Sequence, residues 1–537
     1  MADPARAQEL KAEGNALFAK GEYAAAHQKY EDAIQYDDRN AILYANRAAC
    51  SIHLDKFSEA KADAKQAVEL DPAYAKGWAR MATACDGLGE YGESVKCWRK
   101  AMAALPKDNL TASDARQKKQ CEDGLRTAAV NIAKAAGLVD MGQMRGKFPW
   151  DRVKAIENEL HAGLPANAGS SAWLMLRAAK LWDRGMQAMM QQRTRIGPTG
   201  EEFGGCPGAL TDLTDAILTD SRIFRMEGSW MDMYNKQVML ETMNSGAWPA
   251  LPMAKIQEEA MMRQQEHGWD AARLAVDVTI RIWLMQGFVA SNTGTDTQTS
   301  LRPFNLILEL LNWGQTSSWG NSSTKDKGNV FEDYFVRGVR KLRMEAMMAH
   351  CAKSPPQGLE AALKALYEEA QIVMQEVGPS LPEGEHEPGF VSAFGIYPKA
   401  HAYTAIGFYH QQTVYRYKSQ SDYEIVCEHS FKAYQAYREA AMLFPKDDES
   451  RAWFIVIAFQ SLQQARSTFK VALHVMEELR LALPETHKIW EFSQIAVRGK
   501  DKACKDILQL EQKMRKDLGD GRITLEDHMP AGYSLTS

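Results

Sequence analysis

Two pairs of polar residues near the start of the sequence have the spacing that places side chains on one face of a helix. Lys76 and Arg80 are four positions apart, and so are Lys11 and Asn15. Residues four apart on an α-helix lie one above the other, one turn apart. Adjacent cations usually mark a solvated surface, but they also form a binding site when an anionic group completes them. The elements that carry these residues decide between the two interpretations.

The first 106 residues contain a repeat with a period of 34. Five columns keep this register: Leu10, Tyr44 and Trp78; Gly14, Ala48 and Ala82; Tyr23, Phe57 and Tyr91; Ala33, Ala67 and Ala101; and Asp38, Pro72 and Pro106. Small residues let two helices approach closely, and proline ends a helix because it cannot supply the N–H. The period and pattern are typical of the tetratricopeptide repeat, a pair of antiparallel helices. Residues 111–136 are amphipathic and suit the helix that caps such an array.

Stacked repeats of this kind form a superhelix whose first helices line a concave groove. Five polar residues on the first helices are candidates to line this groove: Lys11 and Asn15 in the first repeat, Asn46 in the second, and Lys76 and Arg80 in the third. If Trp78 and its periodic counterparts point into the core, these side chains converge in the groove. Residues 1–107 contain 15 Lys+Arg and 16 Asp+Glu. Positive charge would therefore be concentrated in the groove by the placement of these side chains, and not by an excess of basic residues.

This set, with intervals of 4, 31, 30 and 4, resembles the two-carboxylate clamp of tetratricopeptide co-chaperones: Lys11, Asn15, Asn46, Lys76 and Arg80. That family holds the C-terminal Glu-Glu-Val-Asp tail of the seventy- and ninety-kilodalton heat-shock chaperones. The resemblance implies that Lys and Arg neutralise the terminal carboxylate and the last Asp side chain, while Asn donates neutral hydrogen bonds. Phe18 would contact a Val or Met side chain of the peptide, although ordinary core packing explains it equally well. The resemblance covers about residues 7–136.

The remaining four hundred residues are expected to be helical but less regular. From 137 to 395, breaks rich in Gly and Pro fall at 163–170, 196–208, 291–303, 314–328 and 378–389. Repeat character returns later in two sets with identical steps: Ala433, Tyr437, Ala440 and Pro445, then Ala472, Met476, Leu479 and Pro484. We therefore predict an all-α fold with four parts: a clamp domain at 1–136, an irregular helical domain at 137–395, degenerate repeats at 396–516 and a flexible tail at 517–537.

The irregular region is rich in methionine and tryptophan. Between Met141 and Met348 lie 18 of the 26 methionines and 9 of the 13 tryptophans. Such residues at helical spacing usually form a core, and this is the interpretation we favour. The alternative is an adaptable apolar surface that accepts varied partners.

Composition excludes several classes of protein. A net charge of −5, with 25% charged residues, does not indicate a nucleic-acid partner. The most apolar segment, 274–290, carries Asp277 and Arg281, which a membrane span would avoid. The beginning of the sequence lacks the pattern of a secretory signal, and the eight cysteines include no CxxC pair, so we expect a cytoplasmic protein with reduced thiols.

No common nucleotide-binding, hydrolase or metalloprotease motif occurs, so we expect no catalytic residue, metal or cofactor. The sequence predicts a co-chaperone or adaptor that binds a chaperone tail, while its C-terminal region engages a client or a second partner. One alternative is an enzyme with an unrecognised helical catalytic region that is targeted to chaperones. Another is a tetratricopeptide scaffold for a different acidic C-terminal peptide.

Overall fold

The computed structural model describes the chain at residues 3–106, 111–135, 146–197, 200–226, 228–293, 297–317, 319–353, 356–376, 386–417, 423–530 and 533. The all-α prediction is confirmed, because the only strands in these ranges are two segments of five residues. The chain forms two compact units, residues 1–141 and 142–537. The sequence suggested a first boundary at 136/137. The finer divisions at 395/396 and 516/517 stay predictions.

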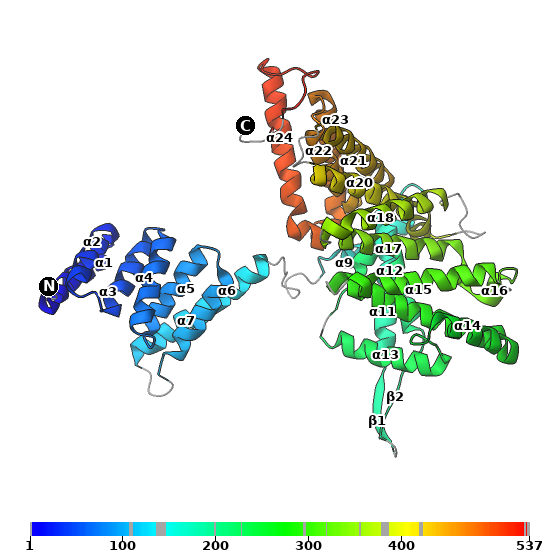
Figure 1. Cartoon of the computed structure of the whole chain (residues 1–537), viewed down its shortest axis with the longest axis horizontal. Coiled ribbons are helices and arrows are strands. Elements are labelled where there is room, and N and C mark those ends of the chain that lie inside the picture. Colours follow the sequence, from blue (N-terminus) through cyan, green and yellow to red (C-terminus); the bar gives the residue numbers. More distant parts are fainter. Residues whose placement is uncertain are drawn as a thin grey trace. The chain divides into compact units, whose positions relative to one another are not determined.

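The first unit is a row of helices in which each packs against the next (Figure 1). They are α1 (Pro4–Ala19), α2 (Tyr23–Tyr36), α3 (Ala41–His53), α4 (Phe57–Leu70), α5 (Ala75–Gly87), α6 (Tyr91–Ala103) and α7 (Ala112–Ala135). Helices α1 to α6 form the three predicted repeats, and α7 is the predicted capping helix. The 34-residue period therefore places one helix pair in each repeat.

Small residues set the close packing of these pairs. The alanine column of the second helices is fully buried: Ala33, Ala67 and Ala101. Gly14 of α1 faces Tyr30 of α2, and a Cβ at this position would lie 2.8 Å from the tyrosine ring. Pro72 and Pro106 each follow the end of a second helix, as predicted. These positions leave little freedom in how the helices of a repeat pair.

The column that begins with Leu10 differs from the prediction that all of its members turn into the core. Leu10 is buried, whereas Tyr44 and Trp78 are only half-buried. The Trp78 indole N–H donates to the Pro72 carbonyl oxygen at 2.9 Å. The Lys100 ammonium lies 4.2 Å from the centroid of the Trp78 ring. An indole with a polar N–H and a face that attracts cations is stable at such a half-exposed edge.

The capping helix α7 packs closely on α6. Cys121 and Ala128 of α7 are fully buried, and Gly124 lies so close to Trp98 that a Cβ would overlap the indole ring. The Trp98 N–H also donates to Asp86 at 3.2 Å, which fixes the position of the ring. The glycine therefore determines how near α7 can approach the third repeat.

Gly124→Ala should loosen the contact between α6 and α7, because overpacking a filled interface costs about 1–3 kcal/mol. We expect faster amide exchange in both helices by hydrogen–deuterium exchange of the full chain. The matched control is Gly92→Ala, since an added Cβ at this helical position of α6 meets no atom within 4 Å. Gly92→Ala should leave exchange unchanged or slow it slightly, owing to better helix propensity. Equal exchange in Gly124→Ala and the wild type would refute the close-packing account.

The second unit contains most of the remaining helices and the hairpin. Its elements of five or more residues are α9 (Pro149–Ala155), α10 (Glu157–Ala162), α11 (Ser171–Met190), β1 (Arg193–Gly197), β2 (Gly200–Gly204), α12 (Ala209–Thr219), α13 (Trp230–Ser245), α14 (Met253–Thr293), α15 (Thr297–Thr316), α17 (Asp333–Lys353), α18 (Pro356–Glu376), η3 (Ser392–Ile396), α20 (Tyr397–Tyr417), α21 (Tyr423–Leu443), α22 (Glu449–Gln464), α23 (Phe469–Trp490), η4 (Ala496–Lys500) and α24 (Asp501–Gly519). Short helical turns are α16 (Thr324–Lys327), α19 (Pro388–Val391), η1 (Ser221–Ile223) and η2 (Asn329–Phe331).

Two predicted breaks contain regular structure instead. The segment 196–208 includes part of an antiparallel hairpin, in which Arg193 pairs with Gly204 and Gly197 with Gly200. This hairpin projects from the second unit (Figure 1), and its Ile196 is 92% exposed. The break at 291–303 is partly filled by α15, which contains Pro303. The segment 377–385 lies outside the described residues.

The most apolar helix is a core helix of the second unit. By length and composition α14 could cross a membrane, but 72% of its most apolar window is buried inside the fold. Its charged residues are also paired within the unit. Arg281 is 5% exposed and contacts Asp215 and Asp277, with 3.3 Å to the Asp277 carboxylate. The apolar composition of α14 is therefore that of a helix buried among other helices of this unit.

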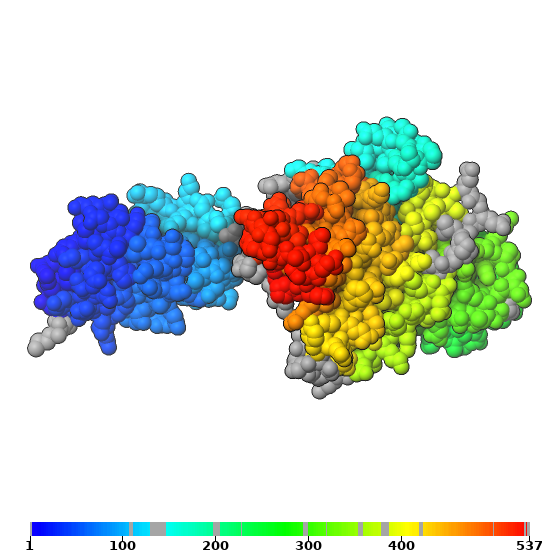
Figure 2. Space-filling model, turned by 90° about the horizontal axis from the view of Figure 1, so that it is seen from above, coloured from blue at the N-terminus to red at the C-terminus, as the bar shows by residue number. Residues whose placement is uncertain are grey.

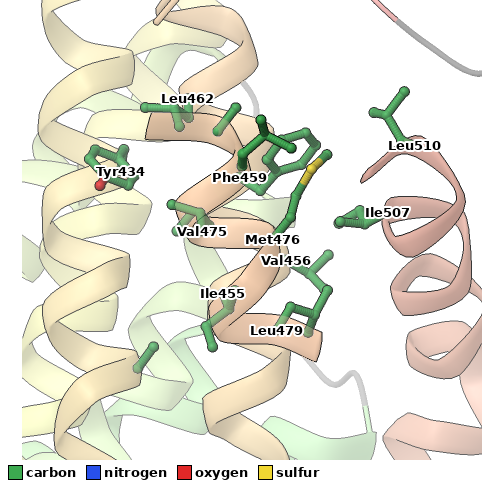
Figure 3. Close-up of a cluster of buried hydrophobic side chains, with 14 of the residues drawn as sticks. Tyr434, Ile455, Val456, Phe459, Leu462, Val475, Met476, Leu479, Ile507 and Leu510 are labelled. Carbon is green, nitrogen blue, oxygen red and sulfur yellow. The ribbon is translucent and has the colours of Figure 1, made fainter. Parts of the chain in front are cut away.

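The C-terminal helices confirm the predicted return of helical repeats. Helices α20 to α23 pack each against the next, and one hydrophobic cluster joins α21 to α24. Figure 3 shows Phe459 and Met476 in this cluster, to which α24 contributes Ile507 and Leu510. One detail differs from the pattern of the first repeats. Helix α23 continues through Pro484 and ends at Trp490, instead of ending near the proline.

The described residues after α24, which fall in the tail predicted to be flexible, pack against the fold. Helix α24 ends at Gly519, which is exposed, and the red segment of Figure 2 lies at the surface of this unit. The backbone then returns to the start of α23, where the Phe469 N–H donates to Asp527 at 3.0 Å. Met529 is buried at 1% exposure and bonds to Ser467 through its N–H at 2.9 Å. The buried Met529 stabilises this return of the backbone to α23. The composition of the segment did not indicate such packing.

A buried charge cluster joins distant segments of the second unit. Arg222 donates to both carboxylate oxygens of Asp448, at 2.9 and 2.8 Å, and also to Asp220. Its guanidinium carbon lies 3.8 Å from the centroid of the Trp490 ring. Burial alone would raise the pKa of Asp448, but the charge and hydrogen bonds of Arg222 outweigh it and lower the pKa. Glu449, 1% exposed, is a further carboxylate within 3.5 Å of Arg222.

Candidate functional site

The polar residues that the sequence singled out lie on the first helices of the three repeats. Lys11 and Asn15 lie on α1, Asn46 on α3, and Lys76 and Arg80 on α5. All of them are at least partly accessible to solvent, and Lys76 and Asn15 are exposed. The period therefore places the five residues on consecutive first helices, as the sequence predicted.

The structure brings the two asparagines into contact. The Asn46 Nδ2 donates to the Asn15 Oδ1 at 3.3 Å, across 31 residues of sequence. The Tyr30 hydroxyl donates to the same oxygen at 2.8 Å. Burial raises the pKa of Tyr30 to about 12, so this hydroxyl stays protonated and keeps donating. Because the Asn15 oxygen accepts both bonds, the amide N–H groups of Asn15 are left to donate to a ligand.

Arg80 is a half-buried cation without an acidic partner. Among the described residues, Arg80 makes neither a hydrogen bond nor an ion pair. Burial lowers the pKa of Arg80, and the neighbouring Tyr74 and Cys50 compensate only in part. By contrast, Arg47 on α3 donates to both oxygens of Asp63, at 2.8 and 2.6 Å. The Arg80 guanidinium has no such partner within the described residues. Because burying an unpaired charge is costly, this arrangement favours an anion from outside the chain.

Lys76 and Arg80 line a pocket of about 260 Å³ between α5 and α7. The other residues of its wall are Ala79, Ser113, Arg116, Gln117 and Gln120. Lys11 and Lys76 likewise have no ion pair or hydrogen bond within the described ranges. Three of the predicted residues are thus cations available to a ligand, and the asparagine pair supplies neutral donors beside them.

Phe18 belongs to an aromatic cluster at the end of α1. Its ring packs edge-on against Tyr23 at 5.2 Å and against His53 at 5.4 Å between centroids. The Tyr23 and His53 rings stack on each other at 4.2 Å. Phe18 remains half-buried, so it contributes to the core and leaves part of its ring accessible.

Sequence reasoning missed one group of residues and offered a second group only as the less favoured alternative. Arg116 and Gln117 of α7 line the same pocket as Lys76, but α7 lies outside the repeat register, so no column pointed to them. The second group is a set of exposed methionines on and near α13: Met190, Met226, Met231, Met239, Met243 and Met262. The tryptophans of this region are mostly buried, so the expected core is formed by tryptophan more than by methionine. The intervals of eight positions from Met231 to Met239 and of four from Met239 to Met243 were the available signal.

The described residues of the second unit differ from this site in how their charged groups are paired. In these ranges no group of three or more His, Cys, Asp or Glu side chains is arranged to hold a metal ion. The buried cluster around Arg222 is internally paired, with Asp220, Asp448 and Glu449 all in contact with the guanidinium. Such mutual pairing is typical of a structural ion-pair network.

Comparisons with known proteins agree with the tetratricopeptide assignment. The Hsp70-Hsp90 organizing protein of Triticum aestivum is 36% identical over 149 residues, which are 27% of this chain and 25% of that protein. The small glutamine-rich tetratricopeptide repeat-containing protein 2 of Saccharomyces cerevisiae is 34% identical over 159 residues, 26% of this chain and 46% of that protein. No family model matches.

Among solved structures, the first tetratricopeptide domain of RPAP3 bound to the HSP90 peptide SRMEEVD is 28% identical. The match covers 25% of this chain and 97% of the RPAP3 chain, with a TM-score of 0.22. This chain spans less than half the length of the two curated relatives. A segment of the chain is therefore similar to tetratricopeptide co-chaperones.

Proposed function

We propose that this protein is a cytosolic, non-enzymatic co-chaperone adaptor that binds the C-terminal Glu-Glu-Val-Asp tail of a heat-shock chaperone. The observation that carries the proposal is the unpaired, half-buried Arg80, which lies one turn from Lys76 on the first helix of the third repeat. A chain terminus that ends in Asp supplies two carboxylates for such cations. Relatives named for organizing Hsp70 and Hsp90 support the same class of partner.

Each predicted residue has a role in this proposal. Lys11, Lys76 and Arg80 neutralise the two terminal carboxylates through charge-assisted hydrogen bonds. Asn15 and Asn46 donate to the carboxylate or to the last peptide group, and their mutual hydrogen bond orients them before the ligand arrives. The accessible part of Phe18 contacts an apolar side chain of the peptide.

The second unit would engage a client or a second partner. Exposed methionines favour this role, because flexible, polarisable side chains adapt to different apolar partners. Met239 is 52% exposed and Met243 76% exposed on α13, whereas Leu240 beside them is buried. An unrecognised catalytic region is the less favoured alternative, since the charged groups around Arg222 are already paired with one another.

A panel of C-terminal peptides tests the proposal. It includes the tails of seventy- and ninety-kilodalton chaperones, a scrambled tail of equal charge, and unrelated acidic termini without Val-Asp. We expect micromolar binding of the Glu-Glu-Val-Asp tails and at least tenfold weaker binding of the others, measured by fluorescence anisotropy with the full chain. Equal binding of every acidic terminus would instead favour a scaffold for another class of peptide.

A further inference from the structure

The pocket between α5 and α7 contains one cation beyond the five predicted residues. Its wall holds three cations, Lys76, Arg80 and Arg116, and no carboxylate. The pKa of Asp114 is lowered by hydrogen bonds from Thr111 and, to a smaller extent, by the charge of Lys76. Asp114 is itself engaged, because it accepts hydrogen bonds from the Thr111 N–H at 3.1 Å and the Thr111 hydroxyl at 2.7 Å. The wall of the pocket therefore carries a net positive charge.

Two side chains of α7 offer unused donors to this pocket. The Gln117 Nε2 is buried and has no hydrogen-bond partner, which is a costly state for an amide N–H group. Arg116 is exposed, and its only hydrogen bond in the described structure runs from Nε to the Ala112 carbonyl oxygen at 3.1 Å. The terminal nitrogens of its guanidinium are free to bind a carboxylate in the bidentate geometry that arginine favours.

The charge of the ligand exceeds what the five predicted residues can neutralise. A Glu-Glu-Val-Asp terminus carries carboxylates on both Glu side chains, on the Asp side chain and at the chain end. Lys11, Lys76 and Arg80, with the asparagine pair, account for the two terminal carboxylates. At least one glutamate carboxylate then needs a cation of its own, and the wall of the pocket provides Arg116 beside Gln117.

We propose that Arg116 and Gln117 bind the side-chain carboxylate of a glutamate that precedes the terminal Val-Asp. The capping helix thereby selects an acidic residue upstream of the chain end, while the three repeats hold the end itself. This inference rests on the proposed function, because it assumes that the terminus is held by the five predicted residues. A pocket of about 260 Å³ has room for one such side chain and ordered water.

A double-mutant cycle between protein and peptide tests this assignment. The parent peptide ends in Glu-Glu-Val-Asp, and its variants carry Gln in place of the first Glu, the second Glu or both. Arg116→Ala and Gln117→Ala should each weaken the parent peptide, with Arg116→Ala about tenfold or more. Against the variant that lacks the recognised glutamate, both substitutions should change the affinity by less than about twofold.

Lys118→Ala is the matched control, since this exposed lysine lies on the same helix but outside the wall of the pocket. It should not change the affinity for any peptide of the set. The assignment is overturned if Arg116→Ala weakens all peptides equally, if it weakens none, or if Lys118→Ala has the same effect. In each of these cases the proposed function survives provided that Lys76→Ala still abolishes binding, so the two failures are distinguishable.

Discussion

Replacing Lys76 or Arg80 by alanine should reduce the binding free energy of a Glu-Glu-Val-Asp peptide by about 2–5 kcal/mol. In the proposed complex each cation would face a carboxylate that has lost its water, so removing the cation would leave that carboxylate buried and unpaired. A micromolar complex has a binding free energy of about 8 kcal/mol, so such a loss removes most detectable binding. Isothermal titration calorimetry of the full chain measures the change directly.

The same substitutions should leave the thermal melt nearly unchanged. Lys76 is exposed, and Arg80 makes no ion pair within the described part of the first unit. Like charges one turn apart cost a few tenths of a kcal/mol in the free protein, so removing either one relieves a small repulsion. Lys20→Ala at the exposed end of α1 is the control and should bind normally. A clear drop in melting temperature for Lys76→Ala would mean that this residue is structural.

Arg222→Ala should destabilise the second unit by about 3–5 kcal/mol, the usual cost of leaving buried charges without their partner. Asp448 and Glu449, at 0% and 1% side-chain exposure, would lose the guanidinium that neutralises them. The substitution would also remove the contact between Arg222 and the Trp490 ring. Denaturant unfolding followed by tryptophan fluorescence reports this loss, because 11 of the 13 tryptophans lie in residues 142–537.

The matched control for this prediction is Arg184→Ala. Arg184 also donates to both carboxylate oxygens of one aspartate, Asp212, but its side chain is 66% exposed. Solvent screens such a pair, so its loss should cost less than about 1 kcal/mol. If the two substitutions destabilised the protein equally, burial would not explain the strength of the Arg222 cluster.

The first unit could be predicted in detail because its structure repeats. A small residue such as Ala67 recurs every 34 positions, and each recurrence restricts how two neighbouring helices pack. The same register placed Asn15 and Asn46 on adjacent first helices, where the structure shows them bonded. The burial of Trp78 was predicted wrongly, because a period indicates the position of a residue but not how much of a large ring fits into the core.

The remainder depended on contacts that leave no local pattern. Arg222 and Asp448 are 226 positions apart, and the sequence around either residue gives no sign of their contact. Arg116 lies on a helix with no periodic counterpart, so its place in the wall of the pocket emerged only from the packing of α7 on the third repeat. In the second unit, composition indicated helices and a core, but the exposure of Met243 is a property of the assembled fold.

The most direct test of the central claim is a titration of the wild-type full chain with two peptides. Both end in Glu-Glu-Val-Asp, one with a free C-terminal acid and the other amidated. The amide removes one negative charge and replaces one acceptor oxygen by an NH2 group. Binding should therefore fall by at least about thirtyfold, which corresponds to the roughly 2 kcal/mol minimum for losing one partner of a desolvated charge pair. Binding of the free acid should also weaken steadily as salt is raised. If the amidated peptide bound as tightly as the free acid, the groove would not hold a terminal carboxylate, and Lys76 and Arg80 would be a solvated surface pair.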